Sequence, residues 1–124
     1  MTQGRNLVRD DRTFEQRVSA TRQRFIDGLP ARLESIDAAL DAGADAASGE
    51  SHARLIHRML HDLAGNAAML ELDLVEESVR SGLKVAEAAD SGDGSLSPDD
   101  IRAIHLAVAV AHEVARNLKT TAPT

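Results

Sequence analysis

His61 is the histidine whose surroundings in the sequence best suit chemistry. Placed on a helix at about 100° per residue, the apolar side chains of residues 55–70 share one face, which predicts a helix that packs on a core. His61 lies roughly 140° from the centre of that face and is expected to face solvent. A neutral imidazole in such a position is a nucleophile. The sequence therefore predicts a surface helix that carries a reactive histidine.

The helical neighbours of His61, at spacings of three, four and seven residues, form two groups. The neighbours are Arg54, His57 and Arg58 on the N-terminal side, and Ala64, Gly65 and Ala68 on the C-terminal side. A glycine inside a helix costs about 1 kcal/mol relative to alanine, and it is explained where another molecule must approach the backbone closely. The small residues are therefore predicted to leave a clearing for a macromolecular donor. The spacing alone leaves open that His61 is an ordinary surface histidine.

Other kinds of chemistry find less support. His57 and His61 are four residues apart and could chelate a metal, but no third ligand is identifiable, so no metal site is predicted. The sequence has no cysteine, which excludes a disulfide, a thiolate metal site and a cysteine nucleophile. No glycine-rich phosphate loop is present to hold ATP. His105 and His112 are expected to be partly buried.

Four helical segments are predicted. The first begins after Thr13, which forms a capping box with Gln16, and it ends at Gly43 with a kink or a break into two helices at Pro30. The bounds of the others are Ser51 as N-cap to about Leu70, about Leu72 to Ala89, and Pro98 to about Lys119 with Ser97 as cap. Residues 41–50 are predicted to form a helix–helix loop.

These elements predict an all-α, antiparallel up-down-up-down four-helix bundle with a kinked or broken first helix. The chain has 124 residues, which suits one domain. We expect a flexible N-terminal segment over 1–12, the bundle over 13–119 and a frayed tail over 120–124. Aromatic residues are only 2% of the chain, so the core must be aliphatic.

The net charge of −6 argues against nucleic acid or an anionic membrane as partner. No apolar stretch suits a secretory signal or a membrane span, and we expect a cytoplasmic protein. A monomer is predicted. The alternative is a weak dimer through the fourth helix, where Leu106 and Val110 lie away from the apolar face that contains Ile104 and Ala111.

The run from His61 to Leu70, His-Asp-Leu-Ala-Gly-Asn-Ala-Ala-Met-Leu, resembles the second-helix signature of histidine-containing phosphotransfer domains. Residues 25–33 and 38–40 are similar to the first helix of that family, and the resemblance covers about residues 14–118. The sequence departs from the pattern at Ala64, where lysine is usual, and at Glu71, where glycine commonly follows the leucine.

The resemblance implies a phosphocarrier in a two-component phosphorelay, which is not an enzyme. His61 would accept a phosphoryl group from the aspartyl phosphate of a response-regulator receiver domain, such as that of a hybrid histidine kinase, and pass it to another receiver. No cofactor is expected on this chain, and Mg²⁺ is expected on the receiver.

Ala64 leaves the phosphoryl group without the usual lysine. Arg58 is the predicted substitute and Arg54 the second choice, while His57, Gly65 and Ala68 are expected to touch the receiver together with Ala64. Two alternatives remain. One is a degenerate phosphotransfer fold that binds a receiver or kinase without carrying phosphate, and the other is a helical adaptor unrelated to phosphorelays.

Overall fold

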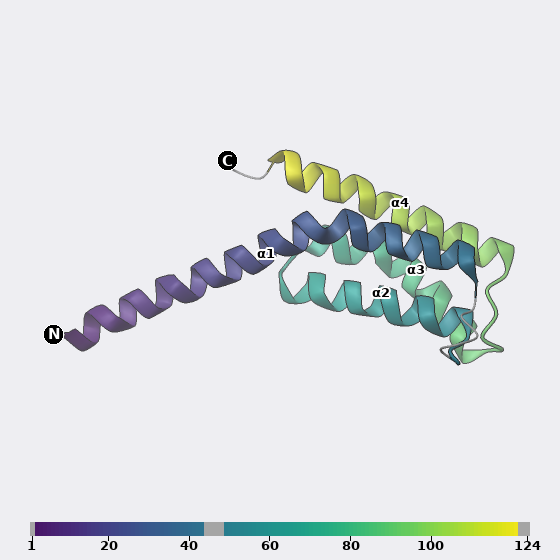
Figure 1. Ribbon diagram of the computed structural model, residues 1–124, viewed down its shortest axis with the longest axis horizontal. Helices are drawn as coiled ribbons and strands as arrows, with labels where there is room; N and C mark the ends of the chain where they lie inside the picture. The colour runs from purple at the N-terminus through teal and green to yellow at the C-terminus, as the bar shows by residue number, and fades with distance from the viewer. Residues whose placement is uncertain (1, 44–48, 122–124) are drawn as a thin grey trace.

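Helices are the only regular secondary structure in the described part of this computed structural model, which comprises residues 2–43 and 49–121, with side chains for 13–43 and 49–119. The helices are α1 (Thr2–Ala42), α2 (His52–Met69), α3 (Asp73–Ser91) and α4 (Pro98–Thr121) (Figure 1). The predicted all-α, four-helix class is thus confirmed.

Each helix packs against two neighbours. The contacting pairs are α1 with α2, α2 with α3, α3 with α4, and α4 with α1. Figure 1 shows the connection between α2 and α3 at the end of the bundle from which α1 projects, and the connection between α3 and α4 at the opposite end. The four helices therefore surround one core.

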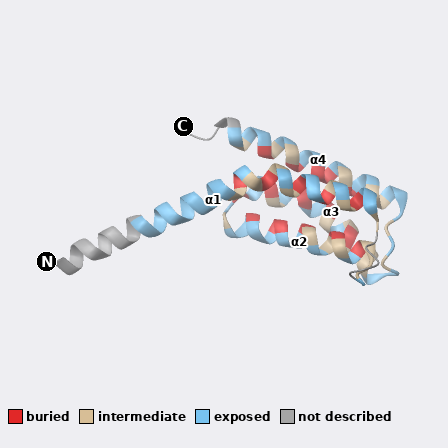
Figure 2. Cartoon of the chain, viewed as in Figure 1, coloured by how far each residue is buried: buried red, intermediate tan, exposed pale blue. Residues whose placement is uncertain are grey.

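Aliphatic side chains fill that core, as the composition predicts. Figure 2 shows buried residues on all four helices. In α1 the fully buried Leu29, Leu33, Ile36 and Leu40 follow one another at steps of three or four residues, so they share one face of the helix. Burying each such side chain contributes roughly 1.5–3 kcal/mol. This hydrophobic stripe fixes how α1 is rotated against the other helices.

The α1 helix differs from its prediction in two ways. It is continuous from Thr2 to Ala42 with Pro30 inside it, so the predicted break into two helices is wrong. Buried Ile26, Leu29 and Leu33 lie on both sides of the proline and hold the two halves on one core despite the lost backbone hydrogen bond. The helix also begins before Thr13, so the predicted capping box does not start it, and segment 2–12, expected to be flexible, belongs to α1.

The predicted helix starts at Ser51 and Ser97 are confirmed. The hydroxyl of Ser51 accepts a hydrogen bond from the Arg54 amide over 3.1 Å. Ser97 and Asp100 form a reciprocal capping box, in which each side chain accepts from the other's amide over 3.0 Å. These caps satisfy amides that have no partner within the helix. Residues 44–48 of the predicted loop and 122–124 of the predicted tail lie outside the described residues.

A tight turn joins α2 to α3. The amide of Leu72 donates to the carbonyl of Ala67 over 2.8 Å, and the amide of Glu71 donates to that of Ala68 over 3.1 Å. This pair of bonds is a Schellman motif. Glu71 has a φ of 59°, the left-handed conformation that glycine adopts without strain. Glutamate therefore adopts this conformation at a cost that glycine would avoid.

Candidate functional site

His61 is exposed on α2, as its helical position predicted. It lies at the edge of an open groove between α2 and α3, with a volume of about 370 Å³. The residues that line the groove are His61, Ala64, Gly65, Glu76, Arg80, Leu83, Lys84 and Glu87. The imidazole belongs to a helix whose Leu60 and Leu63 are buried in the core. It is therefore accessible to a second molecule while its helix is firmly anchored.

The small residues beside His61 have different surroundings. Gly65 and Ala68 are exposed, whereas Ala64 is only 9% exposed and belongs to the core cluster. A Cβ added at Gly65 would meet nothing within 4 Å. The predicted clearing is thus formed by Gly65 and Ala68 at the surface, with the Ala64 methyl group beneath it.

The α3 side of the groove contains two basic residues, Arg80 and Lys84, together with Glu76, Leu83 and Glu87. Arg80 and Lys84 are one helical turn apart on the α3 face that lines it. Arg80 pairs with Glu76 over 2.6 Å, and Lys84 makes no hydrogen bond or ion pair with any described residue. Sequence reasoning missed both cations because it considered only neighbours on the helix of His61. Their four-residue spacing on the next helix was the available signal.

Arg58 lies on a different side of α2. Its Nε and Nη2 atoms donate to the two carboxylate oxygens of Glu50 over 3.0 and 2.8 Å. These hydrogen bonds lower the pKa of Glu50 and raise the pKa of Arg58. Arg58 lines a separate hollow between α1 and α2, together with Arg32 and Asp62. The structure does not bring Arg58 into the groove beside His61, and Arg54 is exposed and does not line that groove either.

His57 contacts both His61 and α3. Its Nδ1 lies 2.8 Å from Oδ2 of Asp90. Its ring is 6.2 Å from the ring of His61, measured between centroids, at an interplanar angle of 89°. Among the residues with described side chains, no group of three histidine, cysteine, aspartate or glutamate residues could hold a metal ion.

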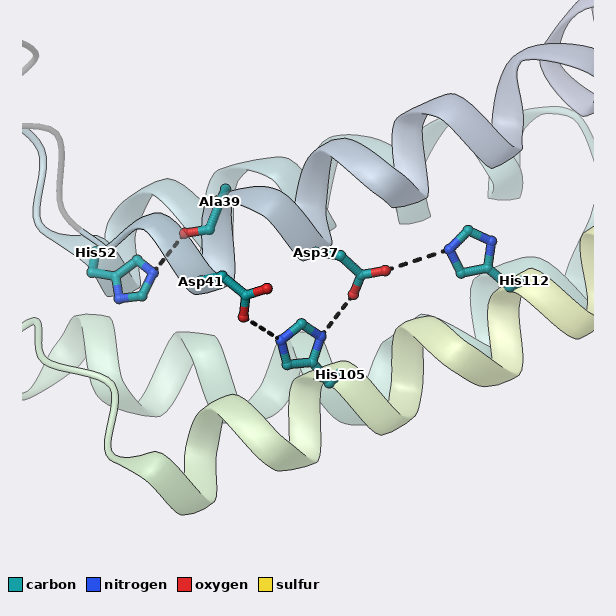
Figure 3. A network of polar contacts seen from close by, with 6 residues as sticks. All are labelled: Asp37, Ala39, Asp41, His52, His105 and His112. Carbon is teal, nitrogen blue, oxygen red and sulfur yellow. Dashed lines mark hydrogen bonds and ion pairs between the residues drawn. The ribbon is translucent and has the colours of Figure 1, made fainter.

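A second polar network joins α1 to α4 on another part of the bundle (Figure 3). His105 bonds Asp37 through Nδ1 over 2.8 Å and Asp41 through Nε2 over 2.9 Å, and His112 lies 3.5 Å from Asp37. His105 and His112 are half-buried, as predicted. Partial desolvation lowers the pKa of His105, but the hydrogen bonds to Asp41 and Asp37 outweigh it and raise that pKa overall. This network connects helices and does not reach the His61 groove.

Another histidine ties α2 to α1. Nε2 of His52 lies 2.9 Å from the Ala39 carbonyl oxygen (Figure 3). A carbonyl oxygen only accepts, so the ring nitrogen donates. His52 therefore has a structural contact at the start of its helix.

Comparison of the chain with protein-family models, with curated proteins and with solved structures finds no match. Over the described residues, the helices are too short or too polar to cross a membrane. The site geometry and the residue pattern around His61 therefore carry the functional argument.

Proposed function

We propose that this chain is a cytoplasmic histidine phosphocarrier with an antiparallel up-down-up-down bundle, in which His61 accepts a phosphoryl group from one receiver domain and passes it to another. The observation that carries the proposal is the groove itself. An exposed imidazole lies at its edge, Gly65 leaves space on the same helix, and Arg80 and Lys84 line the facing helix.

The transfer step requires a neutral imidazole with one nitrogen lone pair free. In the proposed reaction that nitrogen attacks the phosphorus of an aspartyl phosphate. A nitrogen–phosphorus bond forms, the bond between phosphorus and the acyl oxygen breaks, and the receiver regains a free aspartate carboxylate. The proton on the other ring nitrogen stays during the attack and can then be released to solvent. Transfer to the second receiver reverses these steps.

The phosphoryl group spreads negative charge over three oxygens in a loose transition state, and that charge must be neutralised. In the proposed mechanism Lys84 and Arg80 supply the positive charge that a lysine at position 64 supplies in the resembled family. Lys84 is the stronger candidate because no described residue pairs with it, whereas Arg80 already bonds Glu76. Mg²⁺ would be held by the acidic residues of the receiver.

A degenerate phosphotransfer fold is the second candidate function. Ala64 favours this function, because its side chain is buried in the core and position 64 offers no positive charge to a phosphoryl group on His61. A chain of this kind would dock a receiver or kinase through the same groove and would not become phosphorylated. The two functions predict the same binding surface and differ only in chemistry at His61.

The decisive experiment tests whether His61 becomes phosphorylated. The full chain is mixed with receiver domains preloaded by acetyl phosphate, and separately with phosphoramidate, which donates directly to imidazoles. We expect an acid-labile, base-stable phosphate on the wild type and on His57→Gln, and none on His61→Gln. His57→Gln is the matched control because it changes a neighbouring imidazole on the same helix.

Each other outcome has a defined meaning. A label that persists in His61→Gln would show that another residue is the acceptor. Receiver binding without any label, from either donor, would favour the degenerate fold. Label from phosphoramidate but from no receiver would show a reactive histidine whose partner is not a receiver domain.

A further inference from the structure

The large apolar side chains that remain exposed are concentrated on two surfaces. Six are exposed among the described residues, and five of them belong to these surfaces. Phe14 and Val18 lie on α1, and Leu74, Leu106 and Val110 lie on α3 and α4. Exposed apolar clusters of this kind mark interaction sites. Both surfaces are separate from the His61 groove.

The first surface is the part of α1 that projects from the bundle. At 1.5 Å per residue, α1 is roughly 60 Å long and α4 about 36 Å, and Figure 1 shows α1 continuing well past the other helices. Every residue from 13 to 24 is exposed (Figure 2); we call this segment the α1 extension. Phe14 and Val18 are 61% and 43% exposed and lie one turn apart on one face.

The second surface is a groove of about 470 Å³ between α3 and α4, which we call the α3/α4 groove. Leu106, Val110 and Val114 follow one another at four-residue steps along its α4 wall, and Leu74 lies on the α3 wall. Helix-in-groove recognition uses apolar anchors spaced three or four residues apart. The spacing of Phe14 and Val18 matches that requirement.

Charge distinguishes the two surfaces. The α1 extension, residues 13–24, contains three arginines and one glutamate, whereas residues 25–124 contain eight basic and seventeen acidic residues. The only charged residue that lines the α3/α4 groove, among the side chains described, is Glu77. A basic helix with an apolar face therefore complements an acidic bundle with an apolar groove.

We propose that the α1 extension of one copy binds the α3/α4 groove of a second copy, and that reciprocal exchange closes a homodimer. The part of the extension that carries Phe14 and Val18 cannot fold back onto the groove of its own copy, because α1 is one continuous helix that leads away from the bundle (Figure 1). Nearer the bundle, Arg22 of the extension lines a hollow that Leu74 also lines. A reciprocal arrangement covers both apolar surfaces of each copy and leaves none free for further growth. This proposal does not depend on phosphotransfer.

The proposed dimer leaves the His61 groove open. The α3 residues that line the α3/α4 groove are Leu74, Glu77, Ser78 and Ser81, and those that line the His61 groove are Glu76, Arg80, Leu83, Lys84 and Glu87. At about 100° per residue these two sets lie on different faces of α3. Each copy in the dimer can therefore present its own histidine.

The test is sedimentation velocity of the full chain over a range of concentrations. We expect a reversible dimer for the wild type, and monomers for Phe14→Glu and for Val110→Glu. An equimolar mixture of these two variants should recover a heterodimer, because the intact extension of one fits the intact groove of the other. Ala20→Glu and Ala109→Glu are the matched controls, since they add the same charge to exposed positions away from the apolar contacts, and they should remain dimeric.

The variants also separate the other arrangements. A dimer that survives Phe14→Glu and fails with Val110→Glu would mean that α4 pairs with itself, and the opposite pattern would mean that the extensions pair with each other. A wild type that is monomeric at every concentration, or a mixture that forms no heterodimer, would overturn the proposal. Circular dichroism of each variant establishes that the helices are intact.

Discussion

The ring of His57 stands perpendicular to the ring of His61, at 89°, with 6.2 Å between centroids. Asp90 maintains this arrangement, since its Oδ2 lies 2.8 Å from Nδ1 of His57. An ionised carboxylate only accepts hydrogen bonds, so Nδ1 of His57 carries a proton. Asp90 on α3 thus orients the imidazole of His57, which stands beside His61, the proposed phosphate acceptor.

Replacing Asp90 with alanine is expected to release His57. Without the Asp90 carboxylate to accept a hydrogen bond, the tautomer of His57 protonated at Nδ1 is no longer stabilised. The imidazole ¹⁵N shifts of His57 should therefore move towards those of the Nε2-protonated tautomer. The lost hydrogen bond should lower the free energy of unfolding by about 1 kcal/mol. Asp99→Ala, which removes an exposed carboxylate that pairs with Arg102, should leave the His57 shifts unchanged. Unaltered shifts in Asp90→Ala would contradict the assigned hydrogen bond.

Gly65→Leu is expected to block phosphotransfer from a receiver without unfolding the bundle. A Cβ there meets nothing within 4 Å, and removing a helical glycine should stabilise α2 by roughly 0.5–1 kcal/mol. The leucine would occupy the clearing, so transfer should slow by at least about tenfold, a barrier increase near 1.4 kcal/mol. Normal transfer by Gly65→Leu would disprove the clearing.

Gly82 provides the opposite test of the same reasoning. Its added Cβ would lie 3.0 Å from the Cβ of Ala107, because α3 and α4 approach closely there. Gly82→Ala should therefore destabilise the bundle by about 1–3 kcal/mol through overpacking. Urea unfolding of the two variants measures the contrast. Equal changes in the free energy of unfolding for Gly65→Leu and Gly82→Ala would mean that the loss of backbone entropy, and not the room for the new side chain, determines the stability change.

Glu71→Gly is expected to stabilise the protein. A non-glycine residue in the left-handed conformation costs roughly 1–2 kcal/mol, and part of this gain is lost to the greater freedom of glycine in the unfolded chain. The net gain in unfolding free energy should be about 1 kcal/mol. Glu34→Gly, at an exposed helical position of α1, should lose about 1 kcal/mol. Thermal or urea unfolding would compare them.

Lys84→Ala is expected to slow transfer to His61 by about tenfold, since a charge-assisted contact to the phosphoryl group is lost. Arg80→Ala should have a smaller effect because Arg80 is shared with Glu76. Arg102→Ala, which removes a positive charge from α4, is the control and should transfer normally. Single-turnover kinetics provide the rates, and unchanged rates in both groove variants would exclude these cations from the mechanism.

The stability of the fold is expected to fall as pH rises through the titration of His105. The pKa of His105 is raised in the folded state by its hydrogen bonds to Asp41 and Asp37, which outweigh its desolvation. Protonation therefore stabilises the fold fully below the unfolded value near 6.5, and this contribution disappears above the raised folded value. Urea unfolding of the wild type and of His105→Gln across this window should show the slope only in the wild type.

The sequence predicted what depends on local spacing. The period of apolar residues defined the four helices and placed His61 at the surface, and the caps at Ser51 and Ser97 are formed by the side chains that predicted them. The break expected at Pro30 is wrong because local helix rules carry no information on the core contacts on both sides of a proline.

The spacing of residues within one helix could not predict which side chains of neighbouring helices come together. Arg58 was favoured as the phosphate partner because it is one turn from His61, but its hydrogen bonds to Glu50 direct it elsewhere. Arg80 and Lys84 come to the groove from a separate helix, and their position depends on the packing of α3 against α2. Asp37 accepts a hydrogen bond from His105 across the α1–α4 contact, and local spacing within either helix does not predict this pair.

The turn at Glu71 determines how α3 is rotated about its own axis relative to α2. Only three residues separate the two helices, and two backbone bonds fix their path. If one residue were inserted there and α3 rotated about its axis to follow the lengthened turn, every α3 side chain would turn by about 100°. Arg80 and Lys84 would then point away from His61. The length of this turn therefore determines whether His61 on α2 and the positive charges of Arg80 and Lys84 on α3 face the same groove.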